Sequence, residues 1–285
     1  MSVLVTGAAG FIGFHVAQAL LARGEMVYAI DNVSDYYSVA LKRARLAKLE
    51  AFSNFRFYEI DIADRDAVAS ALHAHPDTTG IIHLAAQAGV RYSLVNPYVY
   101  VHANVMGQVV LLEAARRLER LRTFVYASSS SVYGSNQKQP FSVDDRVDHP
   151  VSLYAATKRS CELVTESYCH LVGLHAIGLR FFTVYGPWGR PDMAAYLFAD
   201  AIMADAPIKV FNHGRMARDF TYIDDIVAGT IAALDHPSAG TLPHRLYNLG
   251  NHHPESLLRF IEVLEHALGR KARKEMLPMQ PGDVP

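Results

Sequence analysis

The stretch that decides the fold lies near the start of the chain, where residues 2–13 read SVLVTGAAGFIG. Five residues with strand character, Ser2–Thr6, run directly into glycines at positions 7, 10 and 13, and a helical pattern follows over 11–23. Glycine permits a tight turn and lets a pyrophosphate approach the main chain, while the N terminus of the following helix offers unpaired N–H groups to a phosphate. A strand, a glycine-rich turn and a helix in this order predict a dinucleotide site, although three glycines alone can equally serve helix–sheet packing.

An acidic residue follows at the position that such a site requires. Asp31 ends the next predicted strand, 18 residues after Gly13, and its carboxylate can accept hydrogen bonds from both ribose hydroxyls. The same charge would repel a 2′-phosphate, so the sequence favours NAD over NADP. Asp61 ends the third predicted strand, where it can either reach the adenine amino group or cap the following helix. The small residues of the HLAA run at 83–86 would let the fourth strand lie against the cofactor.

Short apolar runs alternate with longer helical patterns through the first 180 residues. The runs are apolar on both faces, which is typical of parallel strands covered by helices on both sides. We therefore predict an α/β fold with a doubly wound parallel sheet (Rossmann), whose strands all end at one edge, where ligands bind. The predicted elements are strands at 2–6, 26–31, 55–60, 80–84, 123–128 and 176–180 and helices at 11–23, 41–50, 64–73, 97–118 and 152–172.

The pattern loosens after residue 180. The run YGPWGRP at 185–191 is dense in turn residues, and the shorter elements that follow predict a small mixed C-terminal lobe. We assign 1–180 to an NAD-binding domain and 181–285 to a substrate-binding lobe, with helices at 193–203, 223–234 and 256–268 and strands at 208–211 and 247–249. Because the chain stops just after a Gly-Asp turn, we expect the last part of this lobe to be missing.

Composition narrows the class of protein. The chain has 285 residues, is 51% hydrophobic and carries 27 basic and 28 acidic side chains, so its net charge of −1 gives no electrostatic reason to expect a nucleic acid or a membrane as partner. No apolar run approaches the ~20 residues that span a bilayer, and no signal-peptide pattern precedes the first strand. Cys161 and Cys169 are expected to be packed core thiols of a cytoplasmic protein. The histidines show no metal-ligand spacing, so we expect no metal site.

Tyr154 and Lys158 are candidate catalytic residues. Their spacing of four places both side chains on one face of the helix predicted over 152–172. A nearby ammonium favours the phenolate form of a tyrosine, which can then act as a general base near neutral pH. A tyrosine and a lysine at this spacing also occur often by chance. The pair therefore indicates catalysis only in combination with the glycine-rich turn and the serine run that precede it in the chain. The serine run 128–131 ends the preceding strand, where it is either a polar loop or the source of a hydroxyl that bridges a sugar oxygen and the Tyr154 phenol.

Together these motifs resemble those of a known family. The chain resembles the extended short-chain dehydrogenase/reductase family of nucleotide-sugar epimerases and dehydratases in TGAAGFIG (6–13), HLAA (83–86), SSSSVYG (128–134), YAATK (154–158), RFFTVYGP (180–187), RDFTYIDD (218–225), YNLG (247–250) and QPGD (280–283). Within that family it is most similar to the UDP-glucuronate 4-epimerases, in DYY (35–37), AGVRYS (88–93), WGRPDM (188–193) and MLPMQ (276–280). The resemblance implies NAD as cofactor, a UDP-sugar as substrate and a homodimer, which the long helices at 97–118 and 152–172 could form.

The resemblance also implies where the ligands bind. Tyr154, Lys158 and Ser129 would be catalytic, with Ser128 and Ser130 left open as the assisting hydroxyl. The substrate would contact Ser129 and, through its nucleotide, Thr183, Arg218 and Asp283. The cofactor site would comprise Gly7, Gly10, Phe11, Ile12, Gly13, Asp31, Asn32, Asp61, Ile62, Leu84, Ala85, Ala86, Gln87, Asn104, Tyr154, Lys158, Phe181 and Val184.

Two arginines bear on the sugar. Arg190, and alternatively Arg91, can pair with a C6 carboxylate, because a guanidinium fork matches a carboxylate. A phosphate or loop contact is the other interpretation of Arg190. A carboxylate partner would make the substrate a uronate.

The resemblance implies a redox 4-epimerisation of a UDP-sugar through a 4-keto intermediate, and the arginines favour the conversion of UDP-glucuronate to UDP-galacturonate. Tyr154 would take the proton of the C4 hydroxyl while hydride leaves C4 for NAD. The proton and the hydride would both return after the keto sugar has rotated in the pocket. Lys158 would hold the nicotinamide ribose. The 4-keto uronate is a β-keto acid, so the site must hold its carboxylate out of line with the ketone to avoid loss of CO2.

Other functions are alternatives. A UDP-glucose 4-epimerase would leave Arg190 without a carboxylate partner. Related 4,6-dehydratases carry Asp-Glu where this chain has Ser130 and Ser131, and related UDP-glucuronate decarboxylases usually show a Glu in that loop, so both are disfavoured. A non-catalytic NAD-binding regulator would tend to lose Tyr154 or Lys158, and a plain alcohol dehydrogenase would have no use for the lobe.

Overall fold

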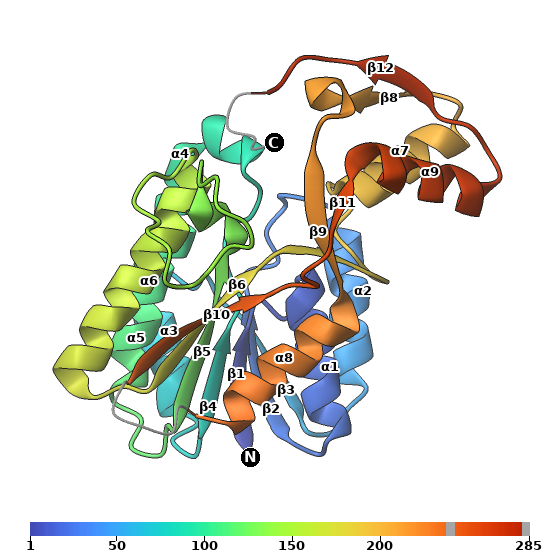
Figure 1. Cartoon of the computed structure of the whole chain (residues 1–285). Helices are drawn as coiled ribbons and strands as arrows, with labels where there is room; N and C mark the ends of the chain where they lie inside the picture. Colours follow the sequence, from blue (N-terminus) through green and yellow to red (C-terminus); the bar gives the residue numbers. More distant parts are fainter. Residues whose placement is uncertain (238–242, 281–285) are drawn as a thin grey trace.

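The computed structural model describes residues 1–237 and 243–280 and contains a large sheet with helices on both faces (Figure 1). Its strands are β1 (Ser2–Thr6), β2 (Met26–Asp31), β3 (Phe55–Glu59), β4 (Gly80–His83), β5 (Thr123–Ser129), β6 (Ala176–Phe181) and β10 (His244–Leu249). The seven strands lie in the order β10-β6-β5-β4-β1-β2-β3, and every pairing in this sheet is parallel. The predicted α/β fold with a doubly wound parallel sheet is therefore confirmed.

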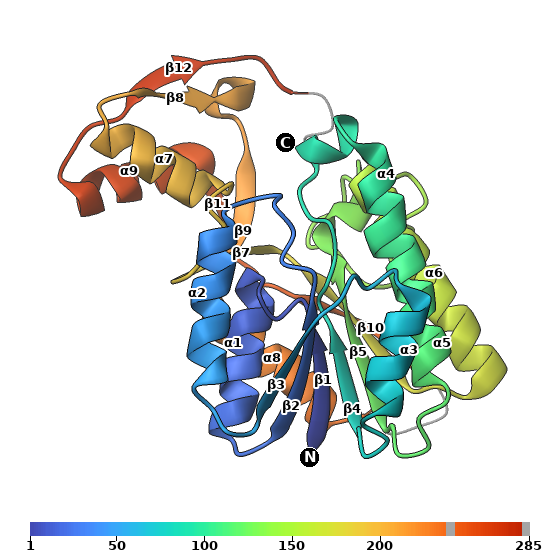
Figure 2. The ribbon, with the colours of Figure 1, turned by 180° about the vertical axis from the view of Figure 1, so that it is seen from behind.

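Side chains of β1 point alternately into two helical layers. Val3 and Val5 pack with α1 (Phe11–Ala22), α2 (Val39–Glu50) and α8 (Ile223–Asp235), whereas Leu4 packs with α3 (Arg65–His73), α5 (Gly107–Ala115) and α6 (Leu153–Val172) on the opposite face. Figure 2, seen from behind, shows the two layers on opposite sides of the sheet. Cys161 and Cys169 are buried in the second layer, as predicted.

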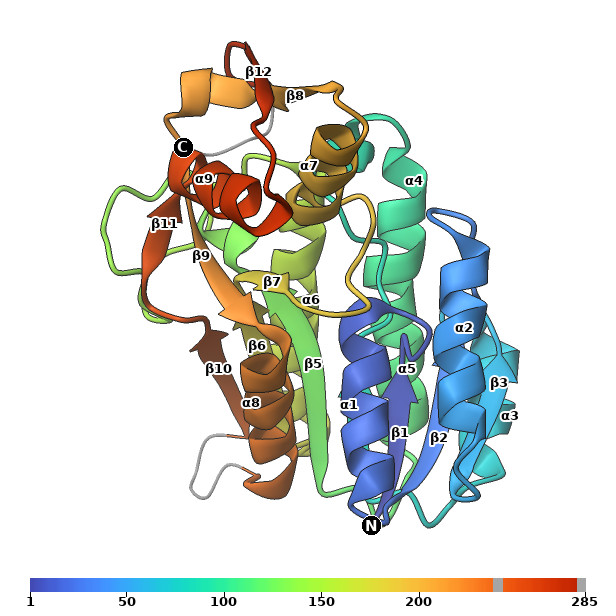
Figure 3. The same ribbon diagram turned by 90° about the vertical axis from the view of Figure 1, so that its right-hand side faces the viewer.

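A smaller lobe lies beyond the carboxyl ends of the large sheet (Figure 3). Two helices, α7 (Ala194–Met203) and α9 (Leu257–Leu268), pack together in it around a core that includes Ile202 and Ile261. Its strands form a three-stranded sheet of order β11-β9-β7 and a two-stranded pair, β12-β8. These strands are β7 (Thr183–Tyr185), β8 (Pro207–Val210), β9 (Ala217–Tyr222), β11 (Pro254–Ser256) and β12 (Arg273–Met276).

The large sheet also takes in two elements from the C-terminal part of the chain. β10 pairs with β6 and extends the sheet, and α8 packs against α1. Both elements follow residue 180, where the sequence suggests the start of a substrate lobe. The large sheet and its helical layers therefore contain elements from both sides of the expected boundary at residue 180.

The single helix predicted over 97–118 is wrong in detail. The chain forms α4 (Pro97–Tyr100), then a π-helical segment (Val101–Met106), then α5, which ends at Ala115. Asn104 lies in the π-helical segment and is buried. π-helical turns often occur at functional sites, and Val99, His102 and Ala103 of this stretch line the cavity at the carboxyl ends of the large sheet.

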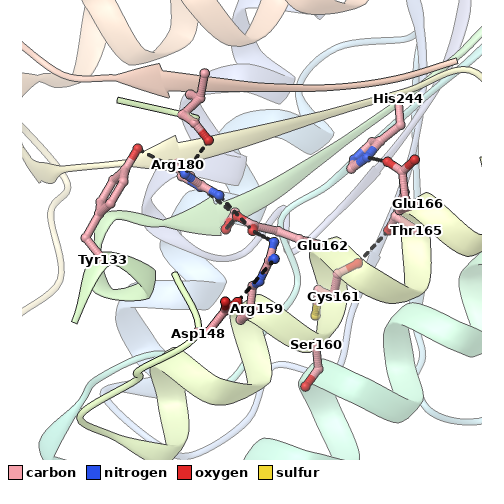
Figure 4. Close-up of polar contacts among 12 residues, drawn as sticks. Tyr133, Asp148, Arg159, Ser160, Cys161, Glu162, Thr165, Glu166, Arg180 and His244 are labelled. Atoms are coloured by element: carbon pink, nitrogen blue, oxygen red, sulfur yellow. Dashed lines mark hydrogen bonds and ion pairs between the residues drawn. The ribbon is translucent and has the colours of Figure 1, made fainter. Parts of the chain in front are cut away.

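A buried ion pair ties α6 to the sheet (Figure 4). The side chains of Glu162 on α6 and Arg180 on β6 are each 1% exposed, and Arg180 donates to both carboxylate oxygens of Glu162, over 2.8 and 3.0 Å. The same carboxylate accepts a hydrogen bond from Ser128, at the end of β5, over 2.6 Å and one from Arg159 over 2.9 Å. Arg180 also donates to the Tyr133 hydroxyl over 3.0 Å. The pair therefore fixes the end of β5 relative to α6.

The ion pair makes the stability of the fold depend on pH. Burial by itself raises the pKa of the Glu162 carboxyl, but the hydrogen bonds and charge of Arg180 outweigh it and hold this pKa below the usual 4.5. A carboxyl whose pKa is lower in the folded than in the unfolded chain stabilises the fold above its unfolded pKa. That contribution is lost as the pH falls through the folded pKa.

Removing one charge of this pair should lower the free energy of unfolding more than removing both. Glu162→Leu leaves the Arg180 guanidinium buried without its carboxylate, and we expect it to lower the free energy of unfolding by about 3–5 kcal/mol. The double variant Glu162→Leu/Arg180→Met should recover part of that loss. Urea unfolding measures both effects, and the deficit of the single variant should shrink as the pH is lowered below about 4.5. A double variant no more stable than the single one would contradict this account.

Candidate active site

A cavity of about 1600 Å³ lies at the carboxyl ends of the strands of the large sheet. Its walls come from the glycine-rich turn, the strand ends, the first turns of α6 and the lobe. The cavity brings together most of the site residues predicted from the sequence: Gly7, Gly10, Phe11, Ile12, Gly13, Asp31, Asn32, Asp61, Ile62, Leu84, Ala85, Ala86, Gln87, Ser129, Tyr154, Lys158, Phe181, Thr183, Val184, Arg190 and Arg218.

The glycine-rich turn is packed too closely to accept side chains. A Cβ on Gly13 would lie 2.0 Å from the carbonyl oxygen of Gly7, and a Cβ on Gly7, whose φ is +77°, would lie 2.7 Å from the Ala85 nitrogen. Gly10 closes the turn by donating its N–H to the Gly7 carbonyl over 2.9 Å. Helix α1 begins at the next residue without a side-chain cap, so its first N–H groups are left for a ligand. The turn therefore fits a pyrophosphate.

Asp31 connects this turn to the end of β2. Its Oδ2 accepts a hydrogen bond from the Ala9 N–H over 3.0 Å, and its Oδ1 accepts one from the Val33 N–H over 2.8 Å. Burial raises the pKa of Asp31, while the two N–H groups and the charge of Lys42 act in the opposite direction. The carboxylate also lines the cavity, at the edge where a dinucleotide ribose is expected.

Asn104 lies one layer behind the cavity and does not line it. Its Oδ1 accepts a hydrogen bond from the Gln87 N–H over 2.7 Å, and its Nδ2 donates to the Gln87 carbonyl over 3.1 Å. Nδ2 also donates to Thr157 on α6 over 3.0 Å. Asn104 therefore holds the main chain of Gln87, and thereby one wall of the cavity, against the catalytic helix.

Tyr154 and Lys158 lie in the first turns of α6 and both line the cavity. Ser152 caps the helix by accepting a hydrogen bond from a main-chain N–H, which fixes where the helix starts. Lys158 Nζ donates to the Ala127 carbonyl over 2.8 Å, so its ammonium is anchored at the end of β5. The ring of Tyr100 meets that of Tyr154 edge-on, with centroids 6.1 Å apart. The pair is thus held in place by groups from two other elements.

The serine hydroxyls differ in their partners. Ser128 donates to Glu162 over 2.6 Å, so its proton is used inside the protein. Ser129 Oγ accepts a hydrogen bond from the Ser131 N–H over 3.1 Å, which leaves the Ser129 hydroxyl proton for a ligand. Both serines line the cavity. The geometry therefore favours Ser129 over Ser128 as the donor to a substrate oxygen.

His83 supports the site from below. Its Nδ1 shares a hydrogen bond of 2.7 Å with Thr6 Oγ1, which also accepts one from the Ala85 N–H over 3.1 Å. Burial, and to a smaller extent the charge of Lys158, lowers the pKa of His83 to about 3. The imidazole is therefore neutral at physiological pH and serves to connect β1 with β4 beneath the cofactor edge.

Arg190 lines the cavity as an oriented cation. Its Nε and Nη2 donate to Oδ1 and Oδ2 of Asp192 over 3.1 and 2.5 Å, and Tyr36 donates to Oδ2 of the same carboxylate over 3.2 Å. Burial alone would lower the pKa of Arg190, but Asp192 outweighs burial and raises it. The guanidinium is therefore firmly charged, and its Nη1 group is not used in this pair.

The other predicted substrate residues differ in placement. Thr183 on β7 and Arg218 on β9 line the lobe side of the cavity. Arg91 does not line the cavity, and its guanidinium lies over the ring of Phe211, 5.0 Å from the ring centroid. Asp283 lies outside the described residues.

Two cations on α2 belong to the site although they were not predicted from the sequence. Lys42 lines the cavity and donates to the carbonyl and hydroxyl of Ser34 over 2.8 and 2.9 Å, and Arg45 is buried beside it. Both occupy the buried stripe of α2 together with Leu46 and Leu49. A lysine and an arginine at positions of a helix that otherwise face the core are a signal that sequence reasoning could have used.

Within residues 1–237 and 243–280, no cluster of three or more His, Cys, Asp or Glu side chains is arranged to hold a metal ion. No helix in the same ranges combines the length and apolar character needed to cross a membrane.

Comparison with known proteins identifies the family. Residues 3–250 match the model of the NAD dependent epimerase/dehydratase family. The chain belongs to that family. This confirms the resemblance drawn from its motifs, and it places the glycine-rich turn and the Tyr154–Lys158 pair in a family that is NAD dependent.

Individual members of the epimerase/dehydratase family are similar over nearly all of this chain. A probable UDP-glucuronate 4-epimerase of Rhizobium meliloti is 47% identical over 100% of this chain and 87% of its own length. A UDP-glucuronic acid 4-epimerase from Bacillus cereus, solved with UDP-glucuronic acid and NAD, superposes with a TM-score of 0.92 at 38% identity, over 99% of this chain and 88% of that chain. A UDP-glucose 4-epimerase from Thermotoga maritima, solved with UDP-glucose, gives 0.88 at 29% identity, over 100% and 88%.

Proposed function

We propose that the protein interconverts UDP-glucuronate and UDP-galacturonate by redox epimerisation at C4, with NAD as a retained cofactor. One observation carries the proposal: a single cavity is lined by the glycine-rich turn, by Tyr154 and Lys158, and by the Arg190 guanidinium. The relatives from Rhizobium meliloti and Bacillus cereus, which match nearly the whole chain, support the same substrate.

The residues around the cavity fit a dinucleotide. The start of α1 would bind the pyrophosphate of NAD, Asp31 would accept the ribose hydroxyls, and the main chain of Gln87, held by Asn104, would form the adjoining wall. Bound there, NAD would supply the acceptor for hydride from C4 and return it.

Proton transfer is the task of the side chains. Tyr154 would remove the proton of the C4 hydroxyl, and Lys158, anchored on the Ala127 carbonyl, would hold the nicotinamide ribose. Ser129 would donate to the reacting oxygen, because the Ser128 hydroxyl is used by Glu162. After the keto sugar has rotated in the cavity to present its other face, Tyr154 would return the proton to the same oxygen, which restores the starting state of the protein.

Arg190 favours a uronate over a neutral sugar. Its guanidinium is oriented by Asp192, and its Nη1 group is not used in that pair, so it can meet the C6 carboxylate. UDP-glucose is the second candidate substrate, which the likeness to the Thermotoga maritima enzyme supports. A neutral sugar would offer Arg190 only a hydroxyl.

We also propose a homodimer in the cytoplasm. The proposed compartment follows from two buried cysteines that form no disulfide. The helical stretch from Pro97 and helix α6 carry large apolar side chains that are exposed in the single chain: Tyr98 (82%), Met106 (52%), Leu163 (54%) and Leu171 (73%). Adjacent helices with such side chains are typical of an interface between symmetric copies.

The purified protein should convert UDP-glucuronate to UDP-galacturonate without added NAD, as followed by proton NMR. Tyr154→Phe removes the group that carries the proton, so kcat should fall by about 10²–10⁴-fold while the melting temperature stays near that of the wild type. No UDP-pentose should form from the wild type. Conversion of UDP-glucose to UDP-galactose alone would move the assignment to a neutral-sugar epimerase, and turnover of neither sugar would contradict the proposal.

Sedimentation equilibrium tests the dimer. The wild type should sediment at twice the chain mass of 31.5 kDa, and Leu163→Arg should sediment as a single chain because it places a charge in the interface. Val263→Arg on α9 is the matched control, since Val263 is 49% exposed outside these helices and its variant should remain dimeric. A wild type of single-chain mass speaks against the dimer.

A further inference from the structure

Arg45, on α2, is a buried cation that the proposed mechanism does not use. The residue is 0% exposed and joins two parts of the cavity wall. Its Nη1 donates to the carbonyl of Ala9, in the glycine-rich turn, over 2.8 Å, and its Nη2 donates to the carbonyls of Trp188 and Gly189 over 2.5 and 3.2 Å. Nη1 also donates to the Tyr37 hydroxyl over 2.8 Å. One guanidinium therefore fastens two loops that are far apart in the sequence.

The loop on the substrate side needs such a fastening. Trp188 has a φ of +58°, in the left-handed region that residues other than glycine rarely adopt. Backbone in that region persists only where its surroundings hold it there. Arg45 binds the Trp188 carbonyl itself, His15 donates to the carbonyl of Pro187 over 2.9 Å, and the ring of Phe14 lies 5.8 Å from that of Trp188. The conformation of the loop thus depends on residues of α1 and α2.

Arg190 follows directly after the two carbonyls that Arg45 binds. The position of its guanidinium therefore depends on the strained loop. At the other end, the Ala9 N–H donates to the Asp31 carboxylate over 3.0 Å, while the Ala9 carbonyl accepts from Arg45. Arg45 therefore links the group expected at the cofactor ribose with the cation expected at the sugar.

We propose that Arg45 is a positioning residue that sets reaction specificity. By holding the loop of Trp188 and Gly189 against the glycine-rich turn, it keeps Arg190 where the substrate carboxylate stays out of line with the C4 ketone. This inference rests on the proposed function, because only a uronate substrate carries that carboxylate. A lysine cannot replace Arg45, since a single ammonium cannot reproduce the planar fork that spans three carbonyls.

The side reaction that Arg45 prevents follows from the chemistry of the 4-keto uronate. When the C5–C6 bond lies perpendicular to the plane of the ketone, it can break, and CO2 leaves. The bonding electron pair then forms the C4–C5 double bond of an enolate, and a proton taken up at C5 gives the UDP-4-ketopentose. Return of the hydride to C4, with a proton on the C4 oxygen, then gives a UDP-pentose. Alignment of the carboxylate is therefore the point at which epimerisation and decarboxylation separate.

Arg45→Lys should loosen the loop and change the products. Trp188 is the only tryptophan of the chain, so its fluorescence reports directly on this loop. We expect a red-shifted emission and at least about a twofold increase in acrylamide quenching. With UDP-glucuronate, 4-epimer formation should slow by about 10–100-fold, and UDP-pentose, which the wild type is expected not to form, should appear among the products. Tyr37→Phe, which removes one acceptor of Arg45, should move all these readouts in the same direction by smaller amounts.

Arg43→Lys is the matched control. Arg43 lies on the same helix, but its side chain is 50% exposed and pairs with Glu59, so its variant should keep the fluorescence and products of the wild type. Unchanged Trp188 fluorescence and an unchanged product ratio in Arg45→Lys would overturn the proposal, and so would a loss of thermal stability with the wild-type product ratio. A wild type that makes no UDP-galacturonate would instead contradict the proposed function, and the fluorescence comparison would still test the hold on the loop.

Discussion

The contact between Gly13 and the carbonyl oxygen of Gly7 is the constraint on which the rest of the site depends. Because a Cβ on Gly13 would lie 2.0 Å from that oxygen, α1 can begin directly on the turn only with glycine there. The closed turn leaves the N–H of Ala9 directed to Asp31 and its carbonyl directed to Arg45. Asp31 and the loop that precedes Arg190 are therefore both held by one turn of main chain. The turn that is expected to bind phosphate thus also influences the position of the Arg190 side chain, which is expected at the sugar.

The second constraint lies on the opposite side of the cavity, where the Glu162–Arg180 pair holds the catalytic helix against the sheet. The pair uses the Ser128 hydroxyl and so separates the roles of neighbouring serines that look alike in the sequence. Through Arg180 it also reaches Tyr133, whose hydroxyl donates to Asn248 over 2.6 Å at the end of β10. The pair thereby connects β10, from the C-terminal part of the chain, with the catalytic helix α6.

The sheet and the catalytic helix are predictable from sequence because their signals are local: apolar strands, a glycine-rich turn and a tyrosine four residues before a lysine. Strands such as β7 and β11 are not, because three-residue segments show no periodicity and form only by pairing with β9. The neighbouring sequence also does not reveal whether a side chain lines a cavity. Asn104 lies one layer behind the cavity, and Arg91 lies over the ring of Phe211. The role of Arg45 depends on two distant carbonyl groups, and only its place in a buried helical stripe hints at it.

In the proposed reaction the hydrogen on C4 leaves and returns within one cavity, without exchanging with solvent. The most direct test is to convert UDP-glucuronate carrying deuterium at C4, in ordinary water and without added NAD. The account predicts UDP-galacturonate that keeps the deuterium at C4, and no incorporation there when unlabelled substrate reacts in deuterated water. Loss of the label to solvent would contradict it, because the hydrogen would then have left C4 as a proton.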